Sequence, residues 1–353
     1  MRWDNLRLTA DQQPPGMSLP LFEQGAVERT FDTPEFRGIT FYEVRARSII
    51  NRVPEASRVP FRWTINPYRG CSHACVYCYA RKTHTYLDLD AGQDFNSRVV
   101  VKVNAAELLR KELAARAWRS EHIAMGTNVD CYQRAEGRYQ LMRGILEALR
   151  DAANPFSILT KGSLILRDLD LLQQAAEVTD VGTNVSVGFV DRELWRSVEP
   201  GTPSPQKRLD VCRTLNDAGI PCGVLMAPIL PFLTDSPSQL AAGVKAVAEA
   251  GATHVAPIVL HLRPGAREWF MAWLAENHPD LVPKFERLYR RGSYAPKAYQ
   301  QEVTGRVHEL ALRFGVGRAG PKDTRRIGDG SQQRRPSDAA RRLEDAPEQI
   351  ALL

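Results

Sequence analysis

Three cysteines that lie close together in the chain are the residues best suited to carry chemistry. Cys71, Cys75 and Cys78 fall in the stretch NPYRGCSHACVYCYAR (66–81), with three residues in the first gap and two in the second. Thiolates from one such loop can converge, and they are good ligands for iron, zinc and Cu(I). No fourth cysteine follows nearby, so a metal centre held here keeps one position that cysteine does not fill.

Three interpretations fit this loop. A structural zinc ion takes four closed ligands, and His73 could supply the fourth, although a ligand two residues from Cys71 would strain so short a loop. Three unrelated core cysteines would have to share this spacing by coincidence. The third interpretation is an iron–sulfur cluster with three protein thiolates and one iron open to a non-protein ligand, since four cysteines close an electron-transfer cluster.

The elements that must position this loop are short apolar runs that alternate with helical segments. Strands are expected at 61–65, 97–103, 122–128, 155–161, 181–190, 220–230 and 253–262. Strands separated by helices of about ten or more residues predict βαβ units and a parallel sheet. About six such units would form a barrel or an open part of one, with functional residues at the carboxyl ends of the strands.

The chain divides into four segments. Residues 1–60 are expected to be an irregular lead-in with a short strand at 38–44, and residues 61–262 to form the α/β core. Residues 263–314 carry two helical segments. From 315 to 353 the chain is polar and poor in aromatic residues, so we expect a disordered tail. The arginine pairs of this tail could contact nucleic acid, although a solvated terminus also accounts for them.

Composition is that of an ordinary globular protein. Of the 353 residues, 43% are apolar and 25% are charged, and the formal net charge is +6. This mildly basic balance permits a polyanionic partner without requiring one. No apolar stretch of about 18 residues and no signal-peptide pattern is present, so we expect a cytoplasmic protein without a membrane span. Its six cysteines are then expected to be reduced.

The cysteine loop resembles that of the radical S-adenosylmethionine (radical SAM) superfamily. The family signature is C-x3-C-x2-C with an aromatic residue before the last cysteine, which is Tyr77 here. The resemblance covers about 61–262, and its finer features are similar to an actinobacterial-type branch of the subgroup related to spore photoproduct lyase. The stretches TNVDCYQRAEGRYQLMRGILEAL, ILTKGSLILRDLDLL and VSVGFVDRELWRSVEPGTPSPQKRLDV carry this finer resemblance. It implies a partial (β/α)6 barrel and a [4Fe–4S] cluster on Cys71, Cys75 and Cys78.

The resemblance also implies a reaction. S-adenosylmethionine binds the open iron, and one electron from the reduced cluster cleaves it to methionine and a 5′-deoxyadenosyl radical that abstracts hydrogen from a substrate. The cofactors carry this chemistry, while the protein supplies position and a dry cavity. An electron donor such as flavodoxin or ferredoxin is an implied partner, and nucleic acid is a candidate partner.

Several residues near strand ends are candidates for holding S-adenosylmethionine. Gly126, Thr127 and Asn128 match the family segment that receives the methionine amino group, with Asp130 as a further candidate. A plain strand-to-helix turn is the alternative, because these residue types favour turns. Lys161 ends a predicted strand and is well placed to bind a carboxylate, unless it is a solvated charge.

Other candidates come from the later strands and from the cysteine loop. Arg208 is a second candidate carboxylate clamp, with a solvated charge as the alternative. Ser186 matches the segment that meets the ribose, and Asn184 points to the same face at period two. The strand that meets adenine matches Met226, Ala227 and Pro228. The Tyr77 ring is placed to stack on adenine.

The remaining cysteines have different expected roles. Cys131 follows Asp130 at the rim of the predicted site. Spore photoproduct lyase uses a cysteine as a hydrogen donor, so the resemblance makes Cys131 a candidate donor, with a simple turn residue as the alternative. Cys212 and Cys222 have apolar neighbours and are expected to pack in the core.

The sequence leaves three classes of function open. The first is a radical enzyme that acts on nucleic acid, and the second is a radical enzyme that modifies a protein or a small metabolite. The third is a non-catalytic zinc or iron–sulfur binding module. No feature of the sequence names a substrate, and likeness of fold is a weak guide to one.

Overall fold

The computed structural model describes residues 25–55, 57 and 59–317. Its main sheet has seven strands in the order β11-β10-β9-β8-β7-β4-β3. Six of them run parallel, as the alternation of strands and helices predicts, and β3 pairs antiparallel with β4 at one edge. The strands are β3 Ile50–Arg52, β4 Trp63–Ile65, β7 Ile123–Met125, β8 Phe156–Thr160, β9 Val181–Ser186, β10 Cys222–Ile229 and β11 Val255–Val259. The sheet is open rather than closed, so the predicted partial (β/α)6 barrel is confirmed.

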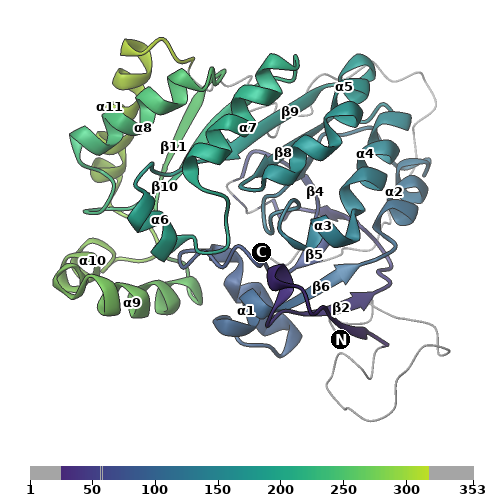
Figure 1. The fold of residues 1–353 in the computed structure, drawn as a ribbon, viewed down its shortest axis with the longest axis horizontal. Helices are drawn as coiled ribbons and strands as arrows, with labels where there is room; N and C mark the ends of the chain where they lie inside the picture. The colour runs from purple at the N-terminus through teal and green to yellow at the C-terminus, as the bar shows by residue number, and fades with distance from the viewer. Residues whose placement is uncertain (1–24, 56, 58, 318–353) are drawn as a thin grey trace.

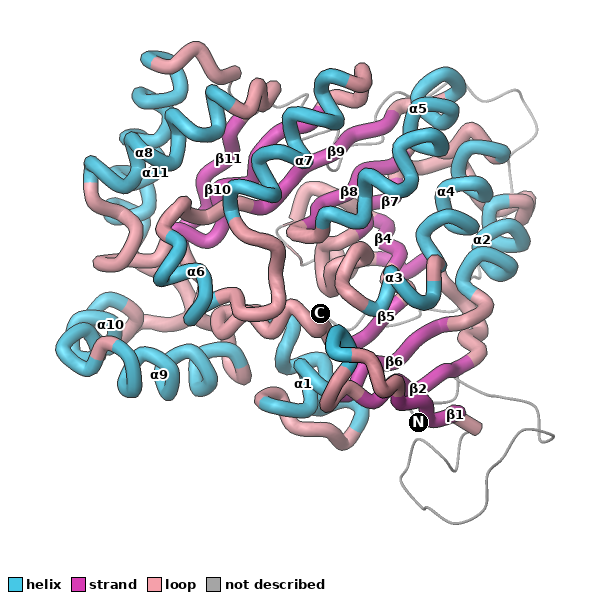
Figure 2. The backbone as a smooth tube through the Cα atoms, in the orientation of Figure 1, coloured by secondary structure: helices cyan, strands magenta, loops and turns pink. Residues whose placement is uncertain are grey.

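Helices cover one face of this sheet, as Figures 1 and 2 show. They are α2 Ala105–Leu113, α4 Leu141–Asp151, α5 Leu169–Val178, α7 Pro205–Asp217, α8 Pro237–Glu249 and α11 Lys297–Arg313. In α4, Met142, Ile145, Leu146 and Leu149 are buried at the helical repeat and fix the face that packs on the sheet. Two helices, α7 and α8, begin with a Ser-Pro pair whose serine side chain accepts a backbone N–H bond, which fixes where each helix starts.

A second, smaller sheet corrects two expectations about the N-terminal half. Its strands are ordered β1-β2-β6-β5, and they are β1 Val27–Thr30, β2 Thr40–Val44, β5 Tyr68–Arg69 and β6 Arg98–Lys102. The segment 97–103, which the sequence places in the main series of strands, therefore belongs to this sheet. The lead-in, expected to be irregular outside 38–44, also contains β1 and β3. Strands of three or four residues with mixed polarity are too short to show the alternation of apolar and polar residues from which a strand is predicted.

Shorter elements connect these layers, and two more helices follow the main sheet. The short elements are α1 Gln93–Ser97, α3 Ala135–Tyr139, α6 Arg192–Val198, η2 Pro34–Phe36, η3 Tyr79–Leu87, η4 Ser163–Asp168 and η5 Pro279–Leu281. The segment 263–314 contains α9 Ala266–Asn277, α10 Val282–Leu288 and α11. Residues of α9, α10 and α11 join the same hydrophobic core as the sheet, so these helices are part of one packed body. The predicted tail beyond 317 lies outside the described residues.

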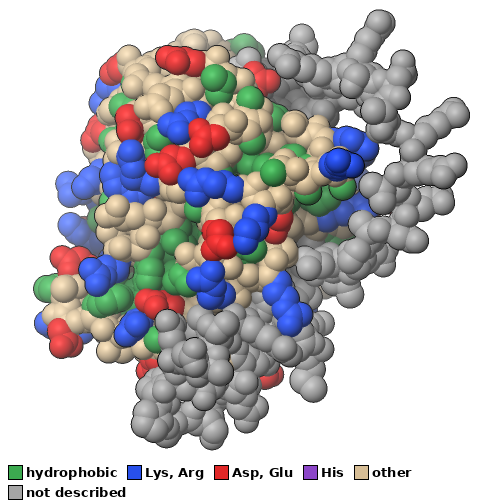
Figure 3. All heavy atoms as spheres, turned by 90° about the vertical axis from the view of Figure 1, so that its right-hand side faces the viewer, with side chains coloured by type: hydrophobic (Ala, Val, Ile, Leu, Met, Phe, Trp, Pro, Cys, Tyr) green, Lys and Arg blue, Asp and Glu red, His purple; other side chains and the backbone are tan. Residues whose placement is uncertain are grey.

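Charges on the outer face of α2, α4 and α5 are interspersed rather than grouped by sign, as the space-filling view shows (Figure 3). Several of them pair across neighbouring helices, including Arg110 with Glu147 and Arg143 with Asp170. Within the described ranges, no helix is long and apolar enough to cross a membrane.

Candidate active site

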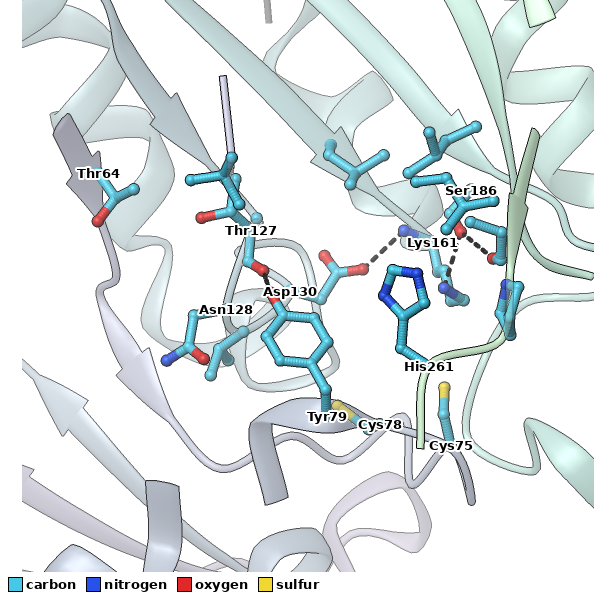
Figure 4. Close-up of a pocket in the computed structure, with 18 of the residues that line it drawn as sticks. Thr64, Cys75, Cys78, Tyr79, Thr127, Asn128, Asp130, Lys161, Ser186 and His261 are labelled. Atoms are coloured by element: carbon cyan, nitrogen blue, oxygen red, sulfur yellow. Dashed lines mark hydrogen bonds between the residues drawn. The ribbon is translucent and has the colours of Figure 1, made fainter. Parts of the chain in front are cut away.

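A cavity of about 1330 Å³ opens at the carboxyl ends of the parallel strands. Residues that follow or end β7, β8, β9 and β10 line it, and the cysteine loop contributes a further part of its wall. Figure 4 shows Lys161 and Ser186 near one end of the cavity in this view and Thr64 and Asn128 near the other. Carboxyl ends of parallel strands share one edge of a sheet, which is why residues distant in sequence meet here.

The cysteine loop lies where the chain passes from the main sheet to the smaller one. Strand β4 belongs to the main sheet, β5 to the smaller sheet, and Cys71 follows β5 after one residue. Cys71, Cys75 and Cys78 all line the cavity, and all three thiols are free. The loop turns tightly, because Ala74 N donates to Cys71 O at 3.2 Å and Cys78 N donates to Cys75 O at 3.3 Å.

Two buried polar side chains fix the backbone of this loop. Arg81 is fully buried and donates to the carbonyls of Ala74 and Cys75 at 3.3 and 3.0 Å, while its guanidinium lies 4.7 Å from the Trp269 ring centroid. Gln133 accepts from Ser72 N at 2.9 Å and donates to Gly70 O at 2.9 Å. The loop is therefore held in shape by residues of the protein itself, before any ligand binds.

The chemistry of the thiols fits a cluster better than a single metal ion. Burial raises the pKa of all three thiols, that of Cys75 to about 12, so a metal centre must displace their protons on binding. Among the described residues, no group of three His, Cys, Asp or Glu side chains is arranged to hold one ion. His73, the candidate fourth zinc ligand, instead directs Nδ1 toward Asp130 Oδ2 at 3.3 Å. A cluster requires no such convergence, because each thiolate binds a different iron.

The carboxylate of Asp130 already accepts hydrogen bonds from groups of the protein. Oδ1 accepts from Tyr132 N and Thr160 Oγ1 at 2.9 and 2.7 Å, and Oδ2 accepts from Lys161 N at 2.6 Å and faces His73. Burial would raise the pKa of Asp130, but the His73 imidazole and these hydrogen bonds lower it to about 2. A carboxylate has about four acceptor sites, so Asp130 is filled. Its structural role is to tie the loop after β7 to the end of β8.

The segment Gly126–Asn128 lines the cavity as predicted, but the glycine also has a structural explanation. Gly126 has φ +76°, and a Cβ there would lie 1.8 Å from Leu159 O. Thr127 O accepts a hydrogen bond from the Tyr79 hydroxyl. The Oδ1 atom of Asn128 is buried and has no hydrogen-bond partner among the described residues, so its acceptor capacity is unused by the protein.

Lys161 and Ser186 meet inside the cavity. Lys161 Nζ donates to Ser186 Oγ at 2.8 Å, and Ser186 Oγ donates to Ala227 O at 2.9 Å. In the described part of the chain the Lys161 ammonium has no carboxylate partner within ion-pair distance, which leaves it free to bind one. Asn184 also lines the cavity, and its Oδ1 is buried without a partner among the described residues. Ala227 and Pro228 line the cavity too, whereas Met226 is 1% exposed and packs in the core.

Arg208 does not reach the cavity, which corrects its predicted role. It is buried, pairs with Glu199, and donates to Ser186 O at 2.7 Å. Glu199 also accepts from the Tyr77 hydroxyl. Tyr77 lines the cavity, with Lys161 Nζ 5.7 Å from its ring centroid. The carboxylate that Arg208 binds is thus a protein carboxylate, and the pair anchors Tyr77 behind the cysteine loop.

Cys131 is the second correction. It is fully buried in the core, and it is absent from the described residues that line the cavity. Burial, together with the nearby charge of Asp130, raises its pKa well above that of a free thiol. A thiol at this position cannot meet a substrate in the cavity. Cys212 and Cys222 are buried in the core, in agreement with their expected packing role.

The sequence alone did not indicate several of the residues that line the cavity. They lie on the smaller sheet, on the loop that follows β2, and after β11. Lys102 carries a weak signal, because a lysine directly after three valines (99–101) is an unusual residue for a buried strand position. Glu199 carries no sequence signal, since its partners Tyr77 and Arg208 come from other elements.

Comparisons with known proteins agree with this geometry. Residues 65–241 match the family model described as the Radical SAM superfamily. An uncharacterized protein of Mycobacterium tuberculosis is 48% identical over 328 residues, which is 92% of this chain and 96% of the relative. An uncharacterized protein of Methanocaldococcus jannaschii is 34% identical over 200 residues, 56% of this chain and 70% of the relative. A solved structure of spore photoproduct lyase complexed with dinucleoside spore photoproduct has a TM-score of 0.59 at 16% identity, covering 78% of this chain and 79% of that one. At this level of identity the likeness concerns the fold.

Proposed function

The chain belongs to the radical SAM superfamily, and we propose that it is an enzyme that cleaves S-adenosylmethionine at a [4Fe–4S] cluster to start a radical reaction. The observation that carries the proposal is the position of three free thiols on one wall of a cavity that also holds unpaired polar groups. The donor set fits both groups: thiolates suit iron, and a free ammonium and free amide oxygens suit an amino acid and a nucleoside.

Each part of the cavity has a task in this proposal. Cys71, Cys75 and Cys78 would hold three irons of the cluster. Lys161 would bind the carboxylate of S-adenosylmethionine, while Asn128 and Asn184 would accept hydrogen bonds from its amino or hydroxyl groups. When bound, the cluster and S-adenosylmethionine together supply a reductive cleavage that yields a 5′-deoxyadenosyl radical. The surrounding wall would keep water away from the reacting atoms.

The substrate and the redox partner belong to the same proposal. Similarity of fold to spore photoproduct lyase supports a lyase-like reaction on nucleic acid as the first candidate. Modification of a protein or a small metabolite is the alternative, because one fold supports many radical reactions. We propose an electron donor such as flavodoxin or ferredoxin, in keeping with the reductive step.

Anaerobic reconstitution with iron and sulfide tests the proposal. The wild type is expected to bind about four irons per chain and to gain the broad visible absorbance of an iron–sulfur cluster. Cys71→Ala, Cys75→Ala and Cys78→Ala should each lose most of the iron, since each thiolate holds a different iron. Cys212→Ala removes a thiol from the core on α7 and should keep the iron. Full iron content in a cysteine-loop variant, or none in the wild type, would refute the proposal.

A further inference from the structure

The cavity is larger than one cofactor needs. Sites for small molecules usually occupy about 300–1,000 Å³, whereas this cavity has about 1330 Å³. The residues assigned to S-adenosylmethionine come from the main sheet and the cysteine loop. Another part of the lining comes from the smaller sheet and the segment after β2, and the proposed function gives this part no role in holding the cofactor. This wall is therefore available to a second molecule.

Positive charge is concentrated in the lining. Among the described residues that line the cavity, Asp130 is the only acidic one, and its acceptor sites are filled. The Lys and Arg side chains in the lining are Arg47, Arg69, Lys102, Lys161, Arg263 and Lys297. This excess contrasts with the mixed charges on the outer face of the helices (Figure 3). A cavity walled mainly by one sign of charge attracts ligands of the opposite sign.

Arg69 and Lys102 are the two cationic residues that the smaller sheet contributes to this wall. Arg69 on β5 pairs with Val100 on β6, and Lys102 lies two residues further along β6. Residues two apart on a strand, and residues opposite each other on paired strands, share one face of the sheet. Both cationic side chains therefore project from the same face into the cavity. Arg47 adds an exposed guanidinium after β2.

None of these three cations is neutralised by another residue within the described ranges. In the described part of the chain, the side chains of Arg47, Arg69 and Lys102 make no ion pair or hydrogen bond. Lys102 is only 4% exposed, and it lies in the lining of the cavity. The nearby carboxylate of Glu112 instead accepts from the backbone of Ile49 and Ile50, both at 2.8 Å. An unpaired buried ammonium is costly, and a lysine with a purely structural role would be expected to have a partner.

The effect of burial on Lys102 also indicates that an anion binds beside it. Burial lowers the pKa of Lys102 to about 7, and the neighbouring Arg69 lowers it further, while Glu112 opposes the shift. An anion bound between the two cations would offset this cost. In the proposed function the carboxylate of S-adenosylmethionine binds Lys161, whose Nζ lies 5.7 Å from the ring centroid of Tyr77 in the cysteine loop, so the anion at Lys102 belongs to another molecule.

Exposed aromatic rings that line the cavity indicate which kind of chemical group would bind next to the anion. Tyr79 and Tyr294 line the cavity and are each 38% exposed. The Arg263 guanidinium lies 5.5 Å from the Tyr79 ring centroid, and the His261 ring is 4.5 Å from that of Tyr294. Exposed rings interleaved with cations are the arrangement that binds nucleotides, by stacking on bases and attracting phosphates.

We propose that Lys102, Arg69 and Arg47 bind a phosphate group of a nucleotide unit in the substrate, with its base near Tyr79 and Tyr294. The inference rests on the proposed function, since it assigns the substrate class of the same cavity. The shared chemistry, a phosphate beside a base, is found in free nucleotides and in nucleic-acid strands.

Binding to the reconstituted holoprotein with S-adenosylmethionine tests the subsite without relying on turnover. The probes are thymidine monophosphate, a short mixed-sequence single-stranded oligonucleotide, and the same oligonucleotide with neutral methylphosphonate linkages, all at one fixed low salt concentration. The variants are Lys102→Met and Arg47→Gln. Arg69 is left unchanged because it lies two residues before Cys71. Lys207→Met removes an exposed lysine outside this wall and serves as the charge-matched control.

The expected result is binding of a phosphate-bearing probe that falls about ten-fold or more in Lys102→Met, several-fold in Arg47→Gln, and less than about two-fold in Lys207→Met, as charge-assisted hydrogen bonds predict. Equal affinity for both phosphate-bearing probes would indicate a free nucleotide, and tighter binding of the oligonucleotide a strand. No binding of either, unchanged affinity in Lys102→Met, or equal affinity for the neutral oligonucleotide would overturn the inference. Iron content of the same samples tests the proposed function separately.

Discussion

Replacing Lys102 by Met is expected to stabilise the ligand-free protein. Lys102 is 4% exposed and has no partner among the described residues, so folding removes most of its side chain from water and gives its ammonium no counter-charge. Methionine has a similar length and no charge, so it can fill the same space. A lysine that costs stability and is nevertheless present at the wall of a cavity is more readily explained by ligand binding than by folding.

The size of the effect follows from the pKa of Lys102. Burial lowers it from 10.5 to about 7, and a shift of one unit corresponds to about 1.36 kcal/mol. The unfolded chain binds the proton more tightly, so the cost is fully present below about pH 7 and disappears as pH rises toward 10.5. The difference of 3.5 units sets an upper limit of roughly 5 kcal/mol below pH 7, which falls to about 1 kcal/mol near pH 10.

Denaturant unfolding of the wild type, Lys102→Met and Lys207→Met across pH 6 to 10 measures this cost. The free energy of unfolding of Lys102→Met should exceed that of the wild type by several kcal/mol near pH 7, and the gap should close with rising pH. Lys207→Met, which removes an exposed lysine, should follow the wild type at every pH. A Lys102→Met protein that is less stable than the wild type at pH 7 would show that the ammonium has a favourable partner, and would refute the reasoning.

Three further predictions concern residues that shape the site. Gly126→Ala places a Cβ 1.8 Å from Leu159 O, whereas Gly219→Ala at a similar φ of +82° meets nothing within 4 Å. Gly126→Ala should therefore lower the melting temperature clearly more than Gly219→Ala, and equal losses would mean that the backbone relaxes. Glu199→Gln leaves the Arg208 guanidinium buried without its counter-charge, and unfolding measurements should show a loss of about 3–5 kcal/mol; a loss below about 1 kcal/mol would contradict the importance of the pair. Arg81→Met removes the donors to the backbone of the cysteine loop, so iron bound after reconstitution should fall several-fold, and unchanged iron would show that the loop holds its shape alone.

The main sheet could be predicted because its strands carry a strong local signal. The run 155–161 corresponds to β8, Phe156–Thr160, and the run 220–230 to β10, Cys222–Ile229. Strands buried on both faces are continuous apolar runs, which are visible in one sequence. The smaller sheet could not be predicted, because β1 and β5 have four and two residues. Its pairing of β2 with β6 joins segments separated by the whole cysteine loop.

The residues of the candidate site also fall into two groups, those that the sequence alone could identify and those that it could not. Cys71, Cys75 and Cys78 sit in one loop, so their spacing alone indicates their chemistry. Arg208 was expected in the cavity and is buried against Glu199, because only the packed structure decides which carboxylate an arginine meets. Lys102 depends on the register of β6 with β5 for its position, and no local pattern encodes that register.

Formation of 5′-deoxyadenosine is the most direct measurement of what this chain does. The reconstituted protein, reduced with dithionite under anaerobic conditions, is mixed with S-adenosylmethionine, and the products are quantified by mass spectrometry. We expect 5′-deoxyadenosine and methionine in equal amounts from the wild type, and neither from Cys75→Ala. A wild-type protein that carries a full cluster and binds S-adenosylmethionine, yet forms no 5′-deoxyadenosine under these conditions, would contradict the assignment as a radical enzyme.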